Sequence, residues 1–193
     1  MTDEQLKELY GKINKLEDKE LKKLVSELIE ELKKDELTST YNRRVLDDNT
    51  KYDIIAICDI DNFKDINDIY GHSTGDKVLM LIADRLKSMI RNDDIVCRYG
   101  GDEFVIIFRN CSSEDVINRI NEIKENILDK NVVPNVTISF GITEYEHNKF
   151  LTQAINEADM ALYNSKREGK NKITNYNDLN NKVLNKNIWP MDN

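Results

Sequence analysis

The sequence feature that most constrains this chain is a pair of adjacent glycines, Gly100 and Gly101, set between two β-rich stretches. Adjacent glycines predict a tight hairpin turn, because both central positions of such a turn favour a positive φ. Two carboxylates, Asp102 and Glu103, follow the glycines directly, and the apolar run 105–108 comes next. The pattern therefore predicts two acidic side chains at a strand end, beside backbone that carries no side chain.

A second acidic pair, Asp59 and Asp61, lies at the end of another apolar run, residues 52–58. If the two strand ends lie side by side, the four acids form a cup of oxygen ligands for a hard divalent cation, next to a glycine gap that admits a phosphate. The alternative is that the acids only occupy a hairpin turn, which acidic residues favour. Two acidic pairs on neighbouring strands would repel each other without a cation, and this favours the metal site.

Composition narrows the class of protein. The 193 residues fit one domain with short additions. The net charge of −8 argues against general nucleic-acid binding, since no basic stripe offsets a phosphate backbone. No apolar run approaches the ~20 residues that span a bilayer, and residues 1–34 are too charged for a signal peptide. The three cysteines read as reduced thiols. We therefore expect a cytoplasmic protein that binds neither nucleic acid nor membrane.

Residues 3–34 are rich in Leu, Glu and Lys and contain no Pro, which predicts helix. The apolar spacing is helical up to residue 16 and again from residue 21, but it slips by one position in between. Either the helix breaks near Asp18 or the apolar seam stutters. Two interpretations remain open: a helix that packs on its own domain, or a short stalk that dimerises.

The rest of the chain alternates between strand and helix patterns. Strands are predicted over 53–60, 94–99, 103–109, 135–142 and 171–175, and helices over 62–70, 75–91, 113–129 and 149–167. The order β-α-α-β-β-α-β-α-β fits an α+β fold, a ferredoxin-like palm domain with an antiparallel-rich central sheet flanked by helices, which we expect on one face. Residues 176–193 are rich in Asn and read as a turn-like tail.

Further motifs accompany the glycine hairpin in a fixed order. They are Asp35–Arg44, Asp59–Asp68, Gly71–Asp76, Val136–Gly141 and Ala158–Tyr163. Together with Gly-Gly-Asp-Glu-Phe at 100–104, they resemble the GGDEF family, the diguanylate cyclases, from about Asp35 to Ile173. The first motif departs at Ser39 and Thr40, where the family usually carries Gly-Leu. The resemblance implies an N-terminal helical segment over 1–34, a GGDEF catalytic domain over 35–175 and a C-terminal tail over 176–193.

Asp59 and Asp102 are the candidate metal ligands, and the resemblance adds the backbone carbonyl of Ile60. Two Mg²⁺ or Mn²⁺ ions per active site would neutralise the triphosphate and polarise the α-phosphorus. The glycine pair of the hairpin belongs to the same catalytic set. Glu103 either contacts a second metal ion or helps to deprotonate the attacking 3′-hydroxyl, and the sequence leaves this choice open.

Asn67 and Asp76 resemble the guanine-reading residues of the family. An amide can satisfy N3 and the exocyclic amine of guanine, and a carboxylate accepts from N1–H and the 2-amino group. Adenine offers no such pair of donors and would leave Asp76 unpaired, so we expect GTP as the substrate. Alternatively, Asn67 is a surface amide and Asp76 caps the helix that follows it.

Lys64, Lys166 and Lys170 are the candidate phosphate contacts, together with backbone amides near Phe63 at a helix start. The family usually carries Arg at the position of Lys170. A lysine lacks the bidentate fork of an arginine, so we expect weaker binding of the β- and γ-phosphates. The alternative for each lysine is a solvated surface charge.

Arg91 and Asp94 precede the glycine pair with the spacing of the family's product-inhibition motif, Arg-x-x-Asp. In this interpretation Arg91 binds a phosphate or guanine edge of cyclic di-GMP, and Asp94 accepts from guanine. The alternative is a helix-terminal arginine followed by a turn acid.

The leading hypothesis is a diguanylate cyclase that condenses two GTP into cyclic di-GMP and two pyrophosphates. Each subunit of a homodimer holds one GTP, and each 3′-hydroxyl attacks the α-phosphate of the other. One alternative is a catalytically weak GGDEF domain that senses GTP or cyclic di-GMP, for which loss of Asp102 would leave signalling intact. Another is a cyclase that makes a mixed cyclic dinucleotide, for which ATP would compete with GTP.

Overall fold

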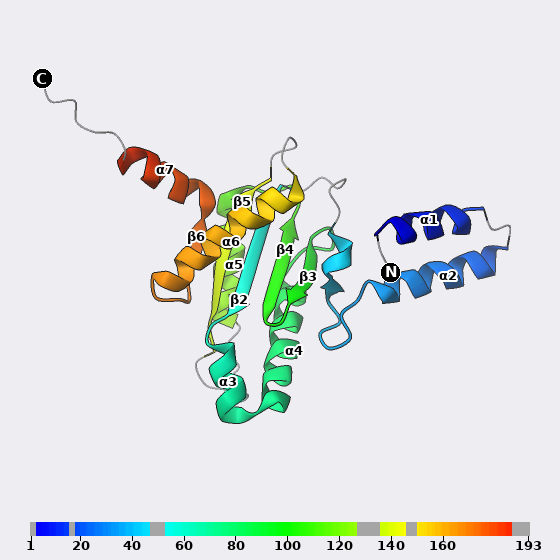
Figure 1. Cartoon of the computed structure of the whole chain (residues 1–193), viewed down its shortest axis with the longest axis horizontal. Helices are drawn as coiled ribbons and strands as arrows, with labels where there is room; N and C mark the ends of the chain where they lie inside the picture. Colours follow the sequence, from blue (N-terminus) through cyan, green and yellow to red (C-terminus); the bar gives the residue numbers. More distant parts are fainter. Residues whose placement is uncertain (1–2, 16–17, 47–52, 127–135, 146–149, 187–193) are drawn as a thin grey trace, which may run out of the picture.

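In the computed structural model, a six-stranded mixed sheet forms the centre of the molecule and helices cover both of its faces (Figure 1). The structure describes residues 3–15, 18–46, 53–126, 136–145 and 150–186. In chain order, the elements are α1 (Asp3–Ile13), α2 (Lys19–Leu32), β1 (Tyr41–Asn42), the 3₁₀-helix η1 (Arg43–Val45), β2 (Ile54–Ile60), α3 (Phe63–Tyr70), α4 (His72–Met89), β3 (Ile95–Gly100), β4 (Glu103–Phe108), α5 (Ser113–Asn126), β5 (Ile138–Glu144), α6 (Leu151–Arg167), β6 (Ile173–Asn175) and α7 (Tyr176–Lys186).

Strand β2 lies in the interior of the sheet, which has the order β1-β3-β4-β2-β5-β6. It pairs antiparallel with β4 on one side and with β5 on the other, and only the edge strands β1 and β6 pair parallel. The near-continuous apolar sequence of β2 matches this place, since alternate residues are buried in the cores on opposite faces. The predicted antiparallel-rich α+β sheet and the predicted element order are confirmed.

The prediction that the helices share one face is wrong. Helices α3, α4 and α5 pack on one face of the sheet, and α6 packs on the other. Because β2 and β4 carry apolar residues on both sides, each face needs a cover. Helix α6 approaches closely at Gly141 of β5, where a Cβ would lie 2.1 Å from the carbonyl oxygen of Ala158 and 2.2 Å from the backbone nitrogen of Leu162.

Three segments differ from the sequence-based expectation. The two-residue strand β1 was not anticipated, and it pairs with β3. Helix α4 begins at His72, three residues before the predicted start. Helix α7 occupies the first part of the segment that reads as a turn-like tail. Residues 127–129, 135 and 149, for which we predicted helix or strand, lie outside the described residues, as does the end of the tail from 187.

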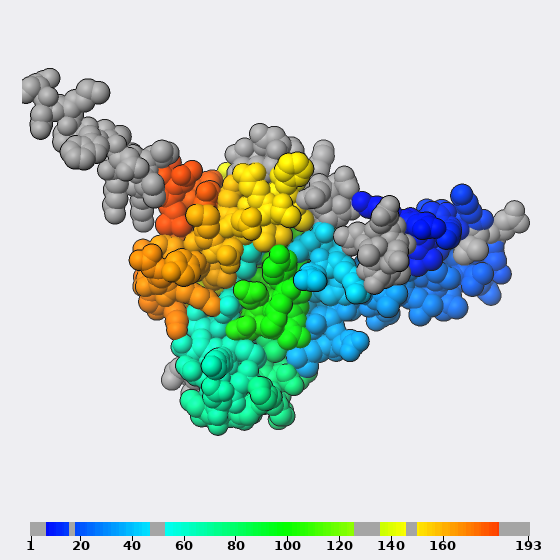
Figure 2. All heavy atoms as spheres, viewed as in Figure 1, coloured from blue at the N-terminus to red at the C-terminus, as the bar shows by residue number. Residues whose placement is uncertain are grey.

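The N-terminal segment is a helical hairpin. The predicted break near Asp18 is confirmed, because the Asp18 carboxylate accepts from the backbone nitrogens of Glu20 and Leu21 and begins α2. Helix α1 lies along α2, with Ile13 and Ile29 buried between them. The two helices stand out from the side of the body (Figure 2). Among the described residues, no helix combines the length and apolar character needed to cross a membrane.

Candidate active site

The glycine hairpin has a different turn from the one the sequence suggests. Strand β3 ends at Gly100 and β4 begins at Glu103, so Gly101 and Asp102 are the two central residues. Gly101 takes a positive φ of 30°, whereas Gly100 does not. The β3–β4 register shifts between Arg98 and Gly100, which leaves one extra residue in β3. The predicted hairpin is present, and Asp102 lies in the turn itself.

Strand pairing brings two of the predicted carboxylates together. Asp59 at the end of β2 lies opposite Glu103 at the start of β4, and Asp102 is the neighbour of Glu103 in the turn. Burial raises the pKa of Asp59 and, with the charge of Asp102, outweighs the opposing effect of the Lys166 ammonium. Burial also raises the pKa of Glu103, and the charges of Asp59 and Asp102 add to the rise. The site therefore favours a cation.

The four acids do not form the predicted cup, and the Asp61 carboxylate is taken up by other partners, as far as the described residues show. Its buried carboxylate accepts from the hydroxyls of Thr137 and Ser139, each at 2.7 Å, and from the backbone nitrogen of Asn171 at 2.9 Å. These bonds join β2 to β5 and to the loop after α6. Asp61 therefore stabilises the fold beside the site.

The remaining groups fit a metal that the substrate helps to bind. Within the described part of the chain, no three acidic, His or Cys side chains converge on a single metal position. The buried Oδ1 of Asp59 accepts no regular hydrogen bond from these residues, and the Lys166 ammonium lies against it as a counter-ion. Mg²⁺ at nucleotide sites takes one or two carboxylates and completes its shell with phosphate and water. Asp59 and Asp102 are suited to be these one or two carboxylate ligands, together with the carbonyl of Ile60 at the strand end.

The two guanine candidates lie on the hairpin formed by α3 and α4. The side chain of Asn67 on α3 is pressed against Gly75 of α4, where a Cβ would lie 1.9 Å from Asn67 Oδ1. Asp76 follows Gly75 and is exposed. It is the fifth residue of α4, so the alternative that it caps this helix is wrong. Gly75, which contacts the side chain of Asn67, was not among the predicted site residues.

Lys166 at the end of α6 and Lys170 just after it contact residues around the end of β2 and the start of α3. Lys166 pairs with Asp59, and Lys170 donates to the side-chain oxygen of Asn62, which precedes Phe63 at the start of α3. Three successive residues, 169–171, have positive φ values of 109°, 63° and 48°, and they turn the chain back toward Asp61. Lys64 is exposed on the first turn of α3. Lys64 and Lys170 thus lie at the N-terminus of α3, whereas Lys166 lies against Asp59 of β2. Their contact with phosphate stays a prediction.

The two residues of the predicted product-inhibition motif lie in different environments. Arg91 is exposed, but the side chain of Asp94 is fully buried. The Asp94 carboxylate accepts from the backbone nitrogens of Arg91 and Arg109, each at 3.0 Å, and pairs with Arg119 of α5 at 2.7 Å. Its role in joining β3, β4 and α5 was not foreseen. Whether Asp94 also accepts from guanine stays a prediction.

Comparisons with known proteins identify relatives of this chain. A family model described as the GGDEF domain of diguanylate cyclases matches residues 32–172. Diguanylate cyclase A of Treponema denticola is 40% identical over 126 residues, which cover 62% of this chain and 34% of that protein. YtrP of Bacillus subtilis is 42% identical over 151 residues, which cover 74% of this chain and 26% of that protein. The chain therefore spans about a quarter to a third of the length of these relatives.

Solved structures show the same fold. The GGDEF domain of DgcB from Caulobacter crescentus, in complex with c-di-GMP, is 30% identical with a TM-score of 0.69 over 75% of this chain and 96% of that one. Diguanylate cyclase SiaD from Pseudomonas aeruginosa, in complex with its activator SiaC, is 29% identical with a TM-score of 0.73 over 89% of this chain and 73% of that one. Because the family model also covers well over half of the sequence, the chain belongs to the GGDEF-domain family of diguanylate cyclases.

Proposed function

We propose that this chain is a diguanylate cyclase, which joins two GTP molecules into cyclic di-GMP and releases two pyrophosphates. One observation carries the proposal: at one end of the sheet Asp59 lies opposite Glu103, the Lys166 ammonium lies against Asp59, and Lys170 contacts Asn62 at the start of α3. The α3–α4 hairpin, which carries Asn67 and Asp76, begins at the same end of the sheet (Figure 1). Membership of the family supports the same activity.

Asp59, Asp102 and the carbonyl of Ile60 would hold the divalent ions that GGDEF cyclases generally use. When bound, these ions neutralise the triphosphate and polarise the α-phosphorus. Glu103, opposite Asp59, is the nearest carboxylate for a second ion or for the 3′-hydroxyl proton. Gly100 and Gly101 leave room for the phosphates. Lys166 would then exchange its contact with Asp59 for a phosphate oxygen.

Substrate selection would fall to Asn67 and Asp76. Asp76 can accept from N1–H and the 2-amino group of guanine, while adenine has no matching donors. Lys64, Lys170 and the amides at Phe63 would bind the triphosphate at the start of α3. The lysine at 170 supplies a point charge where an arginine would supply a planar fork, so we expect GTP to bind more weakly than in cyclases with that arginine.

Two GTP molecules must face each other, so we propose a homodimer with one GTP in each subunit. Helix α2 offers a contact surface, because one side carries a row of leucines that are 45–56% exposed: Leu21, Leu24, Leu28 and Leu32. In this proposal residues 1–34 dimerise, residues 35–175 catalyse and residues 176–193 form an appended segment. Feedback by the product would act through Arg91 and, if Asp94 exchanges a present partner for guanine, through Asp94.

The test is product identification. Purified protein is incubated with GTP and Mg²⁺, with and without ATP, and the products are identified by mass. The proposal predicts cyclic di-GMP in both mixtures and none from the Asp102→Asn variant. A mixed product would show that Asp76 does not enforce guanine. Bound GTP or cyclic di-GMP without turnover would instead favour a sensor.

A further inference from the structure

Arg98 holds the catalytic hairpin from the side of β3. Its Nε and Nη2 both donate to the carbonyl oxygen of Gly101, at 2.9 and 2.8 Å. That carbonyl belongs to the peptide that joins Gly101 to Asp102. The register shift between Arg98 and Gly100 interrupts the regular β3–β4 ladder at this point. The guanidinium therefore supplies hydrogen bonds to the turn where the strand pairing is irregular.

The other edge of the same guanidinium contacts the entrance to the domain. Nη1 of Arg98 donates to both carboxylate oxygens of Asp35, at 3.1 and 3.3 Å. The two side chains are only 18% and 22% exposed, so solvent screens the pair less than a surface ion pair. Burial opposes the ionisation of Asp35, but bonds from Thr38 and Arg98 outweigh it, and the pKa of Asp35 lies below its ordinary value.

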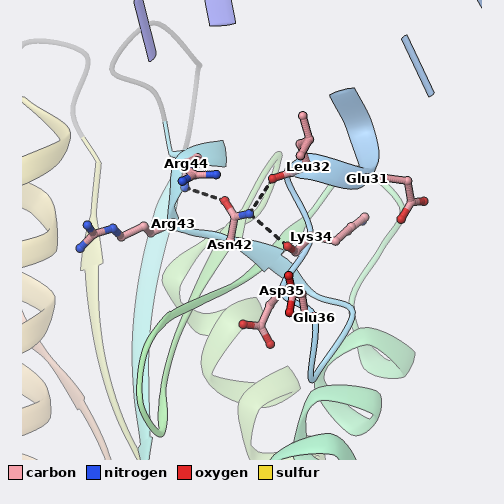
Figure 3. A pocket seen from close by; sticks show the side chains of 8 residues that line it. All are labelled: Glu31, Leu32, Lys34, Asp35, Glu36, Asn42, Arg43 and Arg44. Atoms are coloured by element: carbon pink, nitrogen blue, oxygen red, sulfur yellow. Dashed lines mark hydrogen bonds between the residues drawn. The ribbon is translucent and has the colours of Figure 1, made fainter. Parts of the chain in front are cut away.

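The side chain of Asn42 is bonded to the end of α2 and to Lys34, the residue that precedes Asp35 (Figure 3). The side-chain amide of Asn42 donates to the carbonyl oxygens of Leu32 and Lys34, at 3.0 and 3.1 Å. The backbone nitrogen of Asn42 donates to the carbonyl oxygen of Lys33. Asn42 also pairs with Arg98 in the β1–β3 register. These residues border an open groove of about 460 Å³ between α2 and the body. Asp35 follows Lys34 directly in the chain, so its ion pair with Arg98 and the bonds from Arg98 to Gly101 link the end of α2 to the peptide before Asp102.

We propose that Arg98 is a positioning residue that sets the catalytic hairpin and couples it, through Asp35, to the orientation of α2. This inference rests on the proposed function for its effect on turnover, but the coupling itself is a property of the fold. A displacement of α2 would reach Asp102 through one planar side chain. A lysine at 98 cannot serve both ends, because it presents a single point donor.

The test uses the intact chain with three variants. Arg98→Lys removes the fork, and Asp35→Asn removes the charge and one of the two acceptor oxygens at the α2 end while leaving Arg98 in place. Glu27→Gln is the matched control, because it breaks the exposed α2 pair of Glu27 with Lys23 at 3.7 Å. Amide hydrogen exchange is measured over residues 35–42 and 100–104. Mn²⁺ affinity is measured in the presence of a non-hydrolysable GTP analogue.

We expect Arg98→Lys to speed exchange about tenfold in both segments, the change expected when a charge-assisted hydrogen bond is lost. Asp35→Asn should speed exchange in the hairpin, which is distant from residue 35 in sequence, and weaken Mn²⁺ binding, while Glu27→Gln changes neither. In turnover assays, kcat of Arg98→Lys and of Asp35→Asn should fall about tenfold or more, while KM for GTP stays within about twofold of the wild-type value. Hairpin exchange and Mn²⁺ affinity at wild-type values in Asp35→Asn would overturn the coupling. A wild-type protein without cyclase activity would refute the proposed function and leave the exchange test valid.

Discussion

Gly75 offers a way to separate guanine recognition from folding. In a Gly75→Ala variant the new Cβ would lie 1.9 Å from Oδ1, 3.0 Å from Cγ of Asn67 and 3.3 Å from Cζ of Phe63. The closest atom is the tip of a flexible side chain, so Asn67 rotates away and the backbone stays. Alanine is also about 1 kcal/mol better than glycine inside a helix, so the melting temperature should rise by roughly 2–4 °C or stay unchanged.

Binding should move in the opposite direction. Displacement of Asn67 removes up to two hydrogen bonds to guanine, each worth about 0.5–1.5 kcal/mol, which is roughly a five- to 150-fold rise in Kd for GTP. Isothermal titration with a non-hydrolysable GTP analogue measures this. Gly11→Ala in α1 is the control, because nothing lies within 4 Å of its new Cβ, and it should gain stability without a change in Kd. Wild-type affinity in Gly75→Ala would refute the assignment of Asn67.

Three further predictions concern stability and reactivity. Ser39 has a left-handed φ of 54°, so Ser39→Gly should stabilise the protein by about 0.5–1 kcal/mol in urea unfolding, after the extra entropy of glycine is subtracted; a loss of stability would contradict this. Gly141→Ala places a Cβ about 2 Å from backbone atoms of Ala158 and Leu162, and should cost about 3 kcal/mol or more in the same assay, so an unchanged unfolding midpoint would refute the close packing. Burial raises the pKa of Cys97 to about 12, so iodoacetamide at pH 8 should label this thiol only after unfolding, as read by peptide mass; rapid labelling of the native protein would contradict its burial.

Local signals were enough to predict several features. The slip in the leucine spacing allowed either a helix break near Asp18 or a stutter, and the break is the correct alternative, because the Asp18 carboxylate caps α2. The apolar sequence of β2 predicts burial on both faces, and the helices provide this, with α3, α4 and α5 on one face and α6 on the other. The glycine pair predicts the hairpin, although local sequence did not identify which two residues form the turn.

Features that depend on distant partners were not predictable in the same way. Asp59 and Asp61 both follow the apolar run of β2, and the local sequence does not distinguish their roles. Asp61 is structural because the hydroxyls of Thr137 and Ser139 and the backbone nitrogen of Asn171 donate to it. Asp94 is likewise buried because Arg119 on α5 reaches it. Strand β1 has two residues, too few for any periodic signal. In each case a long-range contact outweighs the local pattern.

The most direct test of the central claim is the stoichiometry of the reaction. Pyrophosphate and cyclic di-GMP are quantified together after incubation with GTP and Mg²⁺, for the wild-type protein and for Asp59→Asn. The account predicts two pyrophosphates for each cyclic di-GMP from the wild-type protein, and neither product from the variant. Cyclic di-GMP at wild-type levels from Asp59→Asn, or release of phosphate or pyrophosphate without any cyclic product, would contradict it.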